Sequence, residues 1–532
     1  MIARGAERSL TARLLPALAV AILSASIVWP GIVAVGEALH ADPPAPVLAT
    51  GRLALLLRGA GIAVAAALAA LLLGAGLAAG LLCAPRWWRG WLPALGLAAL
   101  LTPPYVYAYA WSLLLLRGGV ATALDVDGAA AILLLHGRAV LCLATWLAPL
   151  AAVILAAGWR SAGRSAVALA ALDLSAPGAF VRFGLRAMGP WILLALLTTG
   201  LLALSEFTIC HLCLVLTWNT QILIAAQQLH APGAVARLAW PLLAVLLLLC
   251  AALWPLLPRL RTVIAEMSQL ADDPPAARRA GRPTRAVGAV LGLLAAALIL
   301  APIGILVAAI DSPASVWESW RRYGVEWPGA LRSAALGAAL SVAAALGVAW
   351  LAVCGEKNRR SARFAGALTL VAVIGAISPP AVVGDALAAA WQWPLWVRDS
   401  EWLVAFVGVG RFVLIPILAI RLAIGGMSRT GAELAASDGA SPTVAFWRIR
   451  VLVASGALAG SFIAVGVLLL MEASASQLVR PPGVGNIAVT LLNAIHFGRD
   501  AQVAAMCLLL AAIAATCGAV MGAFIGRRGD KN

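Results

Sequence analysis

The sequence is poor in charge, and lysine in particular is almost absent from it. Asp, Glu, Lys and Arg together make up 11% of the 532 residues, whereas 63% are hydrophobic, compared with about 45–50% in soluble domains. A chain with so few charges cannot keep most of its surface in water, so the composition excludes an ordinary soluble protein. The mean hydropathy of +0.98 indicates that most of the chain faces lipid.

The near absence of lysine also excludes a nucleotide-binding phosphate loop. Such a loop requires Gly-Lys followed by Ser or Thr, but the only lysines are Lys357, which follows Glu356, and Lys531, which follows Asp530. We therefore expect no ATPase activity from this chain and no enzyme function. The energy for any transport must come from a partner or from an ion gradient.

Histidine and cysteine are too scattered to suggest metal chemistry. The 5 histidines are dispersed, which argues against a membrane-embedded lipid-modifying enzyme, and the 8 cysteines lie mostly inside apolar runs, where a thiol behaves as a small hydrophobe. Cys210 and Cys213 form a CxxC pair around His211 but lack the second pair of a zinc site. This pair is either a metal site or ordinary packing, and we predict neither a bound metal nor a cofactor.

Long apolar runs are what the sequence has in abundance. Because a bilayer-spanning helix needs about 20 apolar residues, the runs predict an all-α polytopic membrane protein with about twelve transmembrane helices. We expect these near residues 14–36, 59–82, 91–115, 132–157, 188–206, 238–258, 287–310, 331–353, 365–390, 402–424, 452–471 and 501–525. We interpret the first as a retained span rather than a cleaved signal peptide.

The distribution of positive charge predicts the orientation. Most of the 38 Lys and Arg residues lie in the N-terminal segment and in every second loop, so the positive-inside rule predicts a multi-pass protein of the bacterial inner membrane with both termini in the cytoplasm. The net charge of +16 then reflects orientation, and we expect no nucleic acid partner.

Two sequence-related halves are indicated by a repeat. The first half covers residues 1–258 with its core at 52–258, the second covers 287–532 with its core at 328–525, and the polar segment 259–286 reads as a cytoplasmic linker. Four features recur in the same order, namely Arg58 and Arg332, Pro103–Pro104 and Pro379–Pro380, Gly137–Arg138 and Gly410–Arg411, and Glu206 and Glu472. With six helices per half, these two repeats are parallel.

The most informative segments are the two predicted cytoplasmic loops between the fourth and fifth spans. The second reads GAELAASDGASPTVAFWRIRVLV from Gly431 to Val453. It predicts a short helix, a left-handed turn at Gly439 and a second helix capped by Ser441 with Pro442 at its first position. The first half has VALAALDLSAPGAFVRFGLRAM at the matching place, residues 167–188.

The second loop resembles the EAA loop of binding-protein-dependent ABC importer permeases. On that pattern fall Glu433, Ala435, Gly439, Ala440, Phe446 and Ile449, while Leu434 and Leu452 depart from it. The first loop is degenerate: Ala168 and Leu174 replace the Glu and Gly of the pattern, and either Phe180 or Val181 takes the Phe position. The segments TPPYVYAYAW and LVRPPGVGNIAVTLLNAIHFGRDAQVAAMCLLL resemble parts of the fused ferric-iron-type permeases.

The resemblance implies a type I ABC importer permease fold and a set of partners. These are a cytoplasmic ABC ATPase dimer that uses ATP and Mg, a periplasmic substrate-binding protein, and membrane lipid. The implied ATPase-coupling residues are Ala170, Asp173, Ser175, Phe180, Arg182, Glu433, Ala435, Asp438, Gly439, Ala440, Phe446 and Arg448. The implied substrate is ferric iron, although related fused permeases carry thiamine, phosphonates and other solutes.

A twelve-helix secondary transporter driven by an ion gradient is the alternative interpretation. That class tends to have a basic Gly-Asp-Arg-Gly-Arg-type loop between its second and third spans, and the chain has CAPRWWRGW there. The alternative therefore fits less well.

A translocation pathway is suggested by residues that are unusual inside apolar spans. Glu206 and Glu472 are expected near the outer ends of the fifth and eleventh spans, where they either line the pathway or face water as interfacial charges, and Asp385 has the same ambiguity. The pairs Pro103–Pro104 and Pro379–Pro380 break helical hydrogen bonding and either line a gate or kink helices for packing.

Overall fold

The computed structural model of the chain is helical throughout the part that it describes. This part comprises residues 2–40, 51–83, 94, 96–117, 128–228, 233–256, 258–259, 262, 282–356, 358–390, 393–425, 434, 437–496 and 500–526, and it contains no strand. Within it, 9 helices are long and apolar enough to cross a bilayer, or 11 if each of two bent helix pairs is one span. The predicted all-α, multi-pass membrane character is confirmed, whereas the count of twelve and the two-repeat arrangement stay predictions.

Two compact units make up the chain. Unit 1 comprises Met1–Pro44, Ile222–Trp240 and Tyr323–Thr490, and unit 2 comprises Ala45–Gln221, Pro241–Arg322 and Leu491–Asn532. Three helices are divided between the two units, namely α12 (Trp218–Gln228), α13 (Ala234–Leu253) and α27 (Ile487–His496).

Unit 1 contains the first helices of the chain and most of its second half. Its helices are α1 (Ile2–Leu23), α2 (Trp29–His40), α17 (Glu326–Gly355), α18 (Arg359–Ile377), α19 (Pro380–Ala389), α20 (Leu395–Arg398), α21 (Trp402–Phe412), α22 (Leu414–Gly425), α24 (Pro442–Ala445), α25 (Ser455–Leu470) and α26 (Ser476–Val479). Two π-helical segments, η1 (Ser24–Val28) and η8 (Phe446–Val451), continue α1 and α24.

Unit 2 contains most of the first half and two later segments. Its helices are α3 (Arg52–Cys83), α5 (Pro104–Ser112), α7 (Gly128–Gly158), α8 (Arg164–Ala170), α9 (Ala176–Ala179), α10 (Leu185–Ser205), α11 (Thr208–Leu212), α15 (Arg282–Ala308), α16 (Ala314–Arg322) and α28 (Asp500–Gly526). The π-helical segments η3 (Leu113–Arg117), η4 (Trp159–Gly163) and η5 (Phe180–Gly184) and the 3-10 turn η6 (Trp254–Leu256) complete it.

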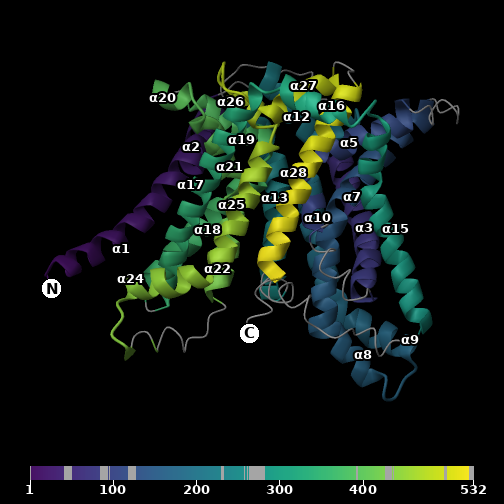
Figure 1. Cartoon of the computed structure of the whole chain (residues 1–532), viewed down its shortest axis with the longest axis horizontal. Helices are drawn as coiled ribbons and strands as arrows, with labels where there is room; N and C mark the ends of the chain where they lie inside the picture. The colour runs from purple at the N-terminus through teal and green to yellow at the C-terminus, as the bar shows by residue number, and fades with distance from the viewer. Residues whose placement is uncertain are drawn as a thin grey trace. The chain divides into compact units, whose positions relative to one another are not determined.

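The first helix of each sequence half packs against the second helix of the other half. In unit 1, α1 packs along α17, and in unit 2, α15 packs along α3 (Figure 1). Small residues allow both contacts, because a Cβ on Gly347 of α17 would collide with Leu15 of α1, and one on Gly292 of α15 would collide with Gly80 of α3. In both units, therefore, the first helix of one half packs on a helix of the other half. A duplicated sequence would produce this symmetry.

The two proline pairs end one helix and begin the next. Pro103 precedes α5 with φ −60° and ψ 140°, and Pro379 precedes α19 with φ −52° and ψ 139°. Before each pair, a hydroxyl donates to the carbonyl oxygen four residues earlier, at 2.8 Å from Thr102 and 2.7 Å from Ser378. The predicted break of the helix at each proline pair is confirmed, with the same local hydrogen bonding at both places. That each pair interrupts the third span of a half stays a prediction.

Two further helices bend sharply, the first where Pro416 cannot donate to the Phe412 carbonyl and the second without a proline at the break. α21 and α22 meet at 54° beside Val413, and the helix formed by α24 and η8 meets α25 at 68°.

In unit 2, Figure 1 shows α8 and α9 at the end of the unit opposite to α5 and α16.

Candidate functional site

The second loop forms the turn that its sequence predicts. Gly439 has a φ of +75°, the left-handed conformation that ends a helix, and nothing lies within 4 Å of a Cβ built on it. Ser441 Oγ then accepts a hydrogen bond from the backbone N–H of Val444 at 3.4 Å, and Pro442 is the first residue of α24. The predicted Gly turn, Ser cap and Pro start are confirmed.

Buried contacts fix the base of this loop to α17. Phe446 is fully buried and makes an edge-to-face contact with Trp350 of α17, with ring centroids 5.0 Å apart. Arg450 donates to both carboxylate oxygens of Glu356, at 3.0 and 3.2 Å, and this fork geometry is stronger than a single contact. The segment that contains Phe446 and Arg450 is therefore attached to α17 by an aromatic contact and a two-point ion pair.

The first loop makes a comparable helix–turn–helix without a left-handed residue. α8 ends at Ala170, whose carbonyl oxygen accepts from Leu174 N at 3.0 Å, and α9 begins at Ala176. Leu174 replaces the glycine of the EAA pattern, and it has no positive φ, since Leu214 is the single non-glycine residue with one in the described part of the chain. The two loops thus reach similar shapes by different turns.

Each loop continues through a π-helical segment that begins with phenylalanine. η5 begins at Phe180 and η8 at Phe446, which favours Phe180 over Val181 as the counterpart of Phe446. Phe180 lies 5.9 Å from Trp159 between ring centroids but stays 41% exposed, whereas Phe446 is fully buried. π-Helical turns are often found at functional positions.

Apolar side chains are exposed on both loops. On the first loop these are Leu169, Leu172 and Val181, and on the second they are Leu434, Trp447 and Leu452. Leu172 is 79% exposed, the largest fraction of the six. Exposed apolar groups beside charged residues are typical of a surface that either another protein or the membrane covers.

The other residues predicted for coupling have different surroundings. Asp173, Ser175, Arg182, Asp438 and Arg448 are exposed, and Ala170 and Ala440 are half-buried. Glu433 and Ala435 lie outside the described residues. Leu434 and Ser437 are helical, and Ser437 Oγ donates to the Leu434 carbonyl at 2.7 Å.

Glu472 is enclosed in a network of hydrogen bonds. It is 5% exposed, it accepts from Arg411 Nη1 at 2.9 Å, and it accepts from the backbone N–H groups of Ala475 and Ser476 and from Ser476 Oγ at 2.9–3.2 Å. The carboxylate therefore caps α26 and neutralises a partly buried arginine. Its role as a pathway residue stays a prediction.

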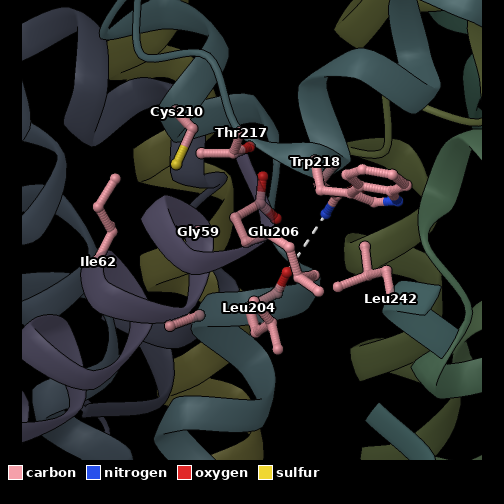
Figure 2. Close-up of a pocket in the computed structure, with 11 residues that line it drawn as sticks. Gly59, Ile62, Leu204, Glu206, Cys210, Thr217, Trp218 and Leu242 are labelled. Carbon is pink, nitrogen blue, oxygen red and sulfur yellow. Dashed lines mark hydrogen bonds between the residues drawn. The ribbon is translucent and has the colours of Figure 1, made fainter. Parts of the chain in front are cut away.

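Glu206 occupies a similar position after α10. Its Oε1 accepts from Thr208 N at 2.7 Å, at the start of α11. Its carboxylate points into a small recess beside Thr217, and Cys210 and Asn219 also line the recess (Figure 2). Both glutamates therefore follow a long helix and accept from the backbone of the short helix after it.

Asn219 is a polar residue of this recess that the sequence interpretation missed. Its Nδ2 donates to the carbonyl oxygens of Ser205 at 2.8 Å and Leu204 at 3.4 Å, so the hydrogens of the amide are used. Its buried Oδ1 has no hydrogen-bond partner, and one ordered water in the recess would satisfy it. The signal in the sequence was the polar TWNTQ run between two apolar spans.

The carbonyl groups freed by the first proline pair have dedicated donors. Because Pro103–Pro104 has no N–H, the carbonyl oxygens of Ala99 and Leu100 lose their helical partners. Tyr107 Oη donates to the carbonyl oxygen of Ala99 at 3.1 Å, and Trp146 Nε1 of α7 donates to that of Leu100 at 3.3 Å.

Both proline pairs and Asp385 lie in or beside the short helices α5 and α19.

The comparisons with known proteins add no family. No protein-family model, curated protein or solved structure matches the chain. Within the described residues, no group of three His, Cys, Asp or Glu side chains is arranged to hold a metal ion.

Proposed function

We propose that the chain is the membrane permease subunit of an ATP-driven, binding-protein-dependent importer. The observation that carries this proposal is the pair of helix–turn–helix loops, 164–184 and 437–451, each of which leads through a π-helical segment into a long apolar helix. Each loop combines exposed apolar side chains with charged neighbours. Two such loops in one chain suit docking to the two subunits of an ATPase dimer.

The attachment of the loops explains how a partner could act on the membrane helices. In unit 1, Phe446 and Arg450 connect the second loop to α17, so a force on the loop reaches α17 directly. In unit 2, η5 continues without a break into α10. A rigid connection of this kind is what conversion of ATPase closure into helix movement requires.

The proposed pathway follows α10 and α25 away from the loops. With 21 residues, α10 is about 30 Å long, enough to place Glu206 at the opposite membrane surface from the first loop. Glu472 follows α25 in the same way. In this proposal the protein lies in the bacterial inner membrane, both loops and both termini are cytoplasmic, and the glutamates are near the periplasmic mouth.

In this proposal, transport is driven by a separate ATPase and the transported substrate is ferric iron. The chain contributes no nucleotide site, so a separate ABC ATPase dimer binds ATP and Mg, and a periplasmic binding protein delivers the substrate. Ferric iron is the proposed cargo, which rests on the resemblance of two segments to ferric-iron-type permeases.

Complex formation tests the proposal. The full chain is purified in detergent with candidate ABC ATPases from its source organism, and association is measured by size-exclusion chromatography. We expect a stable complex that Leu172→Arg or Trp447→Glu weakens. Val325→Arg, an exposed change in the turn before α17 and at the opposite end of that helix from Trp350, is the control for a general loss of folding. Association that is indifferent to both loop substitutions would contradict the proposal.

A further inference from the structure

The recess beside Glu206 brings together polar side chains of unit 2 that are almost fully buried. Thr217, Asn219 and Cys210 line it, and each is 4% exposed. The Glu206 carboxylate points toward Thr217 (Figure 2). The rest of the lining is apolar or aromatic, and no basic side chain of the described residues belongs to it. The recess therefore combines one carboxylate with neutral polar groups.

The amide oxygen of Asn219 is the unsatisfied group of this recess. Asn219 Nδ2 donates to the carbonyl oxygens of Ser205 at 2.8 Å and Leu204 at 3.4 Å, and these two bonds fix which atom of the amide is the oxygen. Oδ1 is buried and has no hydrogen-bond partner. Because a buried acceptor without a partner is costly, the arrangement favours a ligand that this oxygen contacts.

The predicted counterpart of Asn219 in the other half uses its oxygen differently. Asn486 lies 14 residues after Glu472, much as Asn219 lies 13 residues after Glu206. Asn486 Oδ1 accepts from the N–H of Val489 at 3.1 Å and thereby caps α27. The amide oxygen at this position therefore belongs to the helix in one half, and it is not used in this way in the other.

A threonine caps the corresponding helix of unit 2. Thr217 Oγ1 accepts from the N–H of Thr220 at 3.3 Å, and Thr220 Oγ1 accepts from the N–H of Thr217 at 2.7 Å. These reciprocal bonds satisfy the start of α12. The Asn219 oxygen is therefore not needed by the helix and stays available in the recess.

The size and the chemistry of the recess restrict its ligand. The recess has room for one particle of about the size of a water molecule. A carboxylate has about four acceptor positions, so Glu206 can contact both α11 and a ligand. Because Glu206 and Asn219 offer oxygen acceptors, a positively charged ligand fits best. Oxygen ligands suit hard cations, and divalent ions usually take more carboxylates than the single one present here.

We propose that the recess is a binding site for one small monovalent cation such as Na⁺. Glu206 supplies the negative charge, and Asn219 Oδ1 and Thr217 Oγ1 supply neutral oxygens. The ion would connect the end of α10 to the starts of α11 and α12. A site made of oxygens has none of the His and Cys spacing on which the sequence prediction of no metal was based. The inference is independent of the proposed transport function.

Thermal unfolding of the full chain in detergent tests the site. The midpoint is measured in NaCl and in N-methyl-D-glucamine chloride at equal ionic strength. A ligand that binds only the folded protein stabilises it with the logarithm of its concentration above the Kd. We therefore expect Na⁺ to raise the midpoint by a few degrees, and the rise to increase in this way with Na⁺ concentration.

Substitutions locate the effect in the recess. Glu206→Gln keeps an acceptor for α11 but removes the charge, and Asn219→Leu removes the amide oxygen, so both should abolish the difference between the two salts. Glu318→Gln, at an exposed acid of the same unit, should retain it. Asn486→Leu is the matched asparagine control, and the difference should persist even if its midpoint is lower in both salts.

Direct binding of ²²Na⁺ to the purified chain is a second measurement, which does not depend on the stability of the variants. We expect stoichiometric binding that Glu206→Gln removes and Glu318→Gln retains. Equal midpoints in the two salts together with no bound ²²Na⁺ would overturn the inference and leave an ordered water as the occupant of the recess. A Na⁺ effect that persists in both recess variants would also overturn it. Neither result affects ATPase binding by the loops, so failure of this inference is distinguishable from failure of the proposed function.

Discussion

Arg411 on α21 and Glu472 after α25 form a buried ion pair, with Nη1 and Oε1 2.9 Å apart. The side chains are 61 residues apart in sequence and are 16% and 4% exposed. Their attraction is therefore weakly screened by solvent, and the carboxylate also caps α26 through two backbone N–H groups. One carboxylate thus holds three segments of unit 1 together.

Loss of this carboxylate should destabilise the protein strongly. Removal of one member of a buried ion pair typically costs about 3–5 kcal/mol, because the other charge is left without a partner. We expect Glu472→Ala to lower the midpoint of thermal unfolding in detergent by several degrees, with a smaller effect for Glu472→Gln. Glu318→Ala, at an exposed acid, is the control. An equal effect of the two alanine substitutions would show that the ion pair contributes nothing.

Gly439 should matter more than its counterpart Leu174. Alanine at a left-handed position costs about 1–2 kcal/mol, and because nothing lies within 4 Å of a Cβ at Gly439, the effect would come from the backbone alone. We expect Gly439→Ala to weaken binding of the ABC ATPase, measured by biolayer interferometry, and Leu174→Ala to do so less. Similar losses for both would contradict the difference between the loops.

Tyr107 should be important for its hydroxyl group. Tyr107→Phe removes the donor to the Ala99 carbonyl, and a buried acceptor without a partner costs about 1–3 kcal/mol. The expected result is a lower thermal midpoint with unchanged membrane insertion. Tyr323→Phe, at a half-buried tyrosine of the other unit, is the matched control. An equal fall in its thermal midpoint would contradict a specific role for the Tyr107 hydroxyl.

The contact between α3 and α15 should depend on small residues. Gly292→Leu places a side chain against the backbone of Gly80, and such overpacking costs about 1–3 kcal/mol or more. Gly304 lies on the same helix, where a Cβ meets nothing within 4 Å. We therefore expect Gly292→Leu to lower the thermal midpoint and Gly304→Leu to leave it unchanged. Equal thermal midpoints for the two variants would contradict the close packing of α15 on α3.

The local features were readable from the sequence because they depend on neighbouring residues. Gly439, Ser441 and Pro442 encode their turn by backbone preference alone, and Pro103–Pro104 and Pro379–Pro380 end helices wherever they occur. The long apolar runs likewise predict helices in any membrane context.

The long-range features could not be predicted in the same way. The packing of α1 on α17 joins segments about 300 residues apart, and nothing in the local pattern of either helix specifies the other. The positive φ of Leu214 could not be predicted either, because a leucine is disfavoured in the left-handed conformation. The bend between α24–η8 and α25 also lacks a sequence signal, since no proline lies at that break. The bend at Val413 has one in Pro416, which cannot donate to the Phe412 carbonyl four residues earlier.

ATP-driven uptake tests the central claim most directly. The chain is reconstituted in liposomes with the ABC ATPase that it binds and a candidate periplasmic binding protein, and uptake of ferric iron is measured with ATP, in the presence of proton and sodium ionophores. The account predicts uptake that requires ATP, persists with ionophores present and is lost in the loop variants Leu172→Arg and Trp447→Glu. Uptake that collapses with the ionophores and proceeds without ATP or the ATPase would contradict it and would favour a gradient-driven transporter.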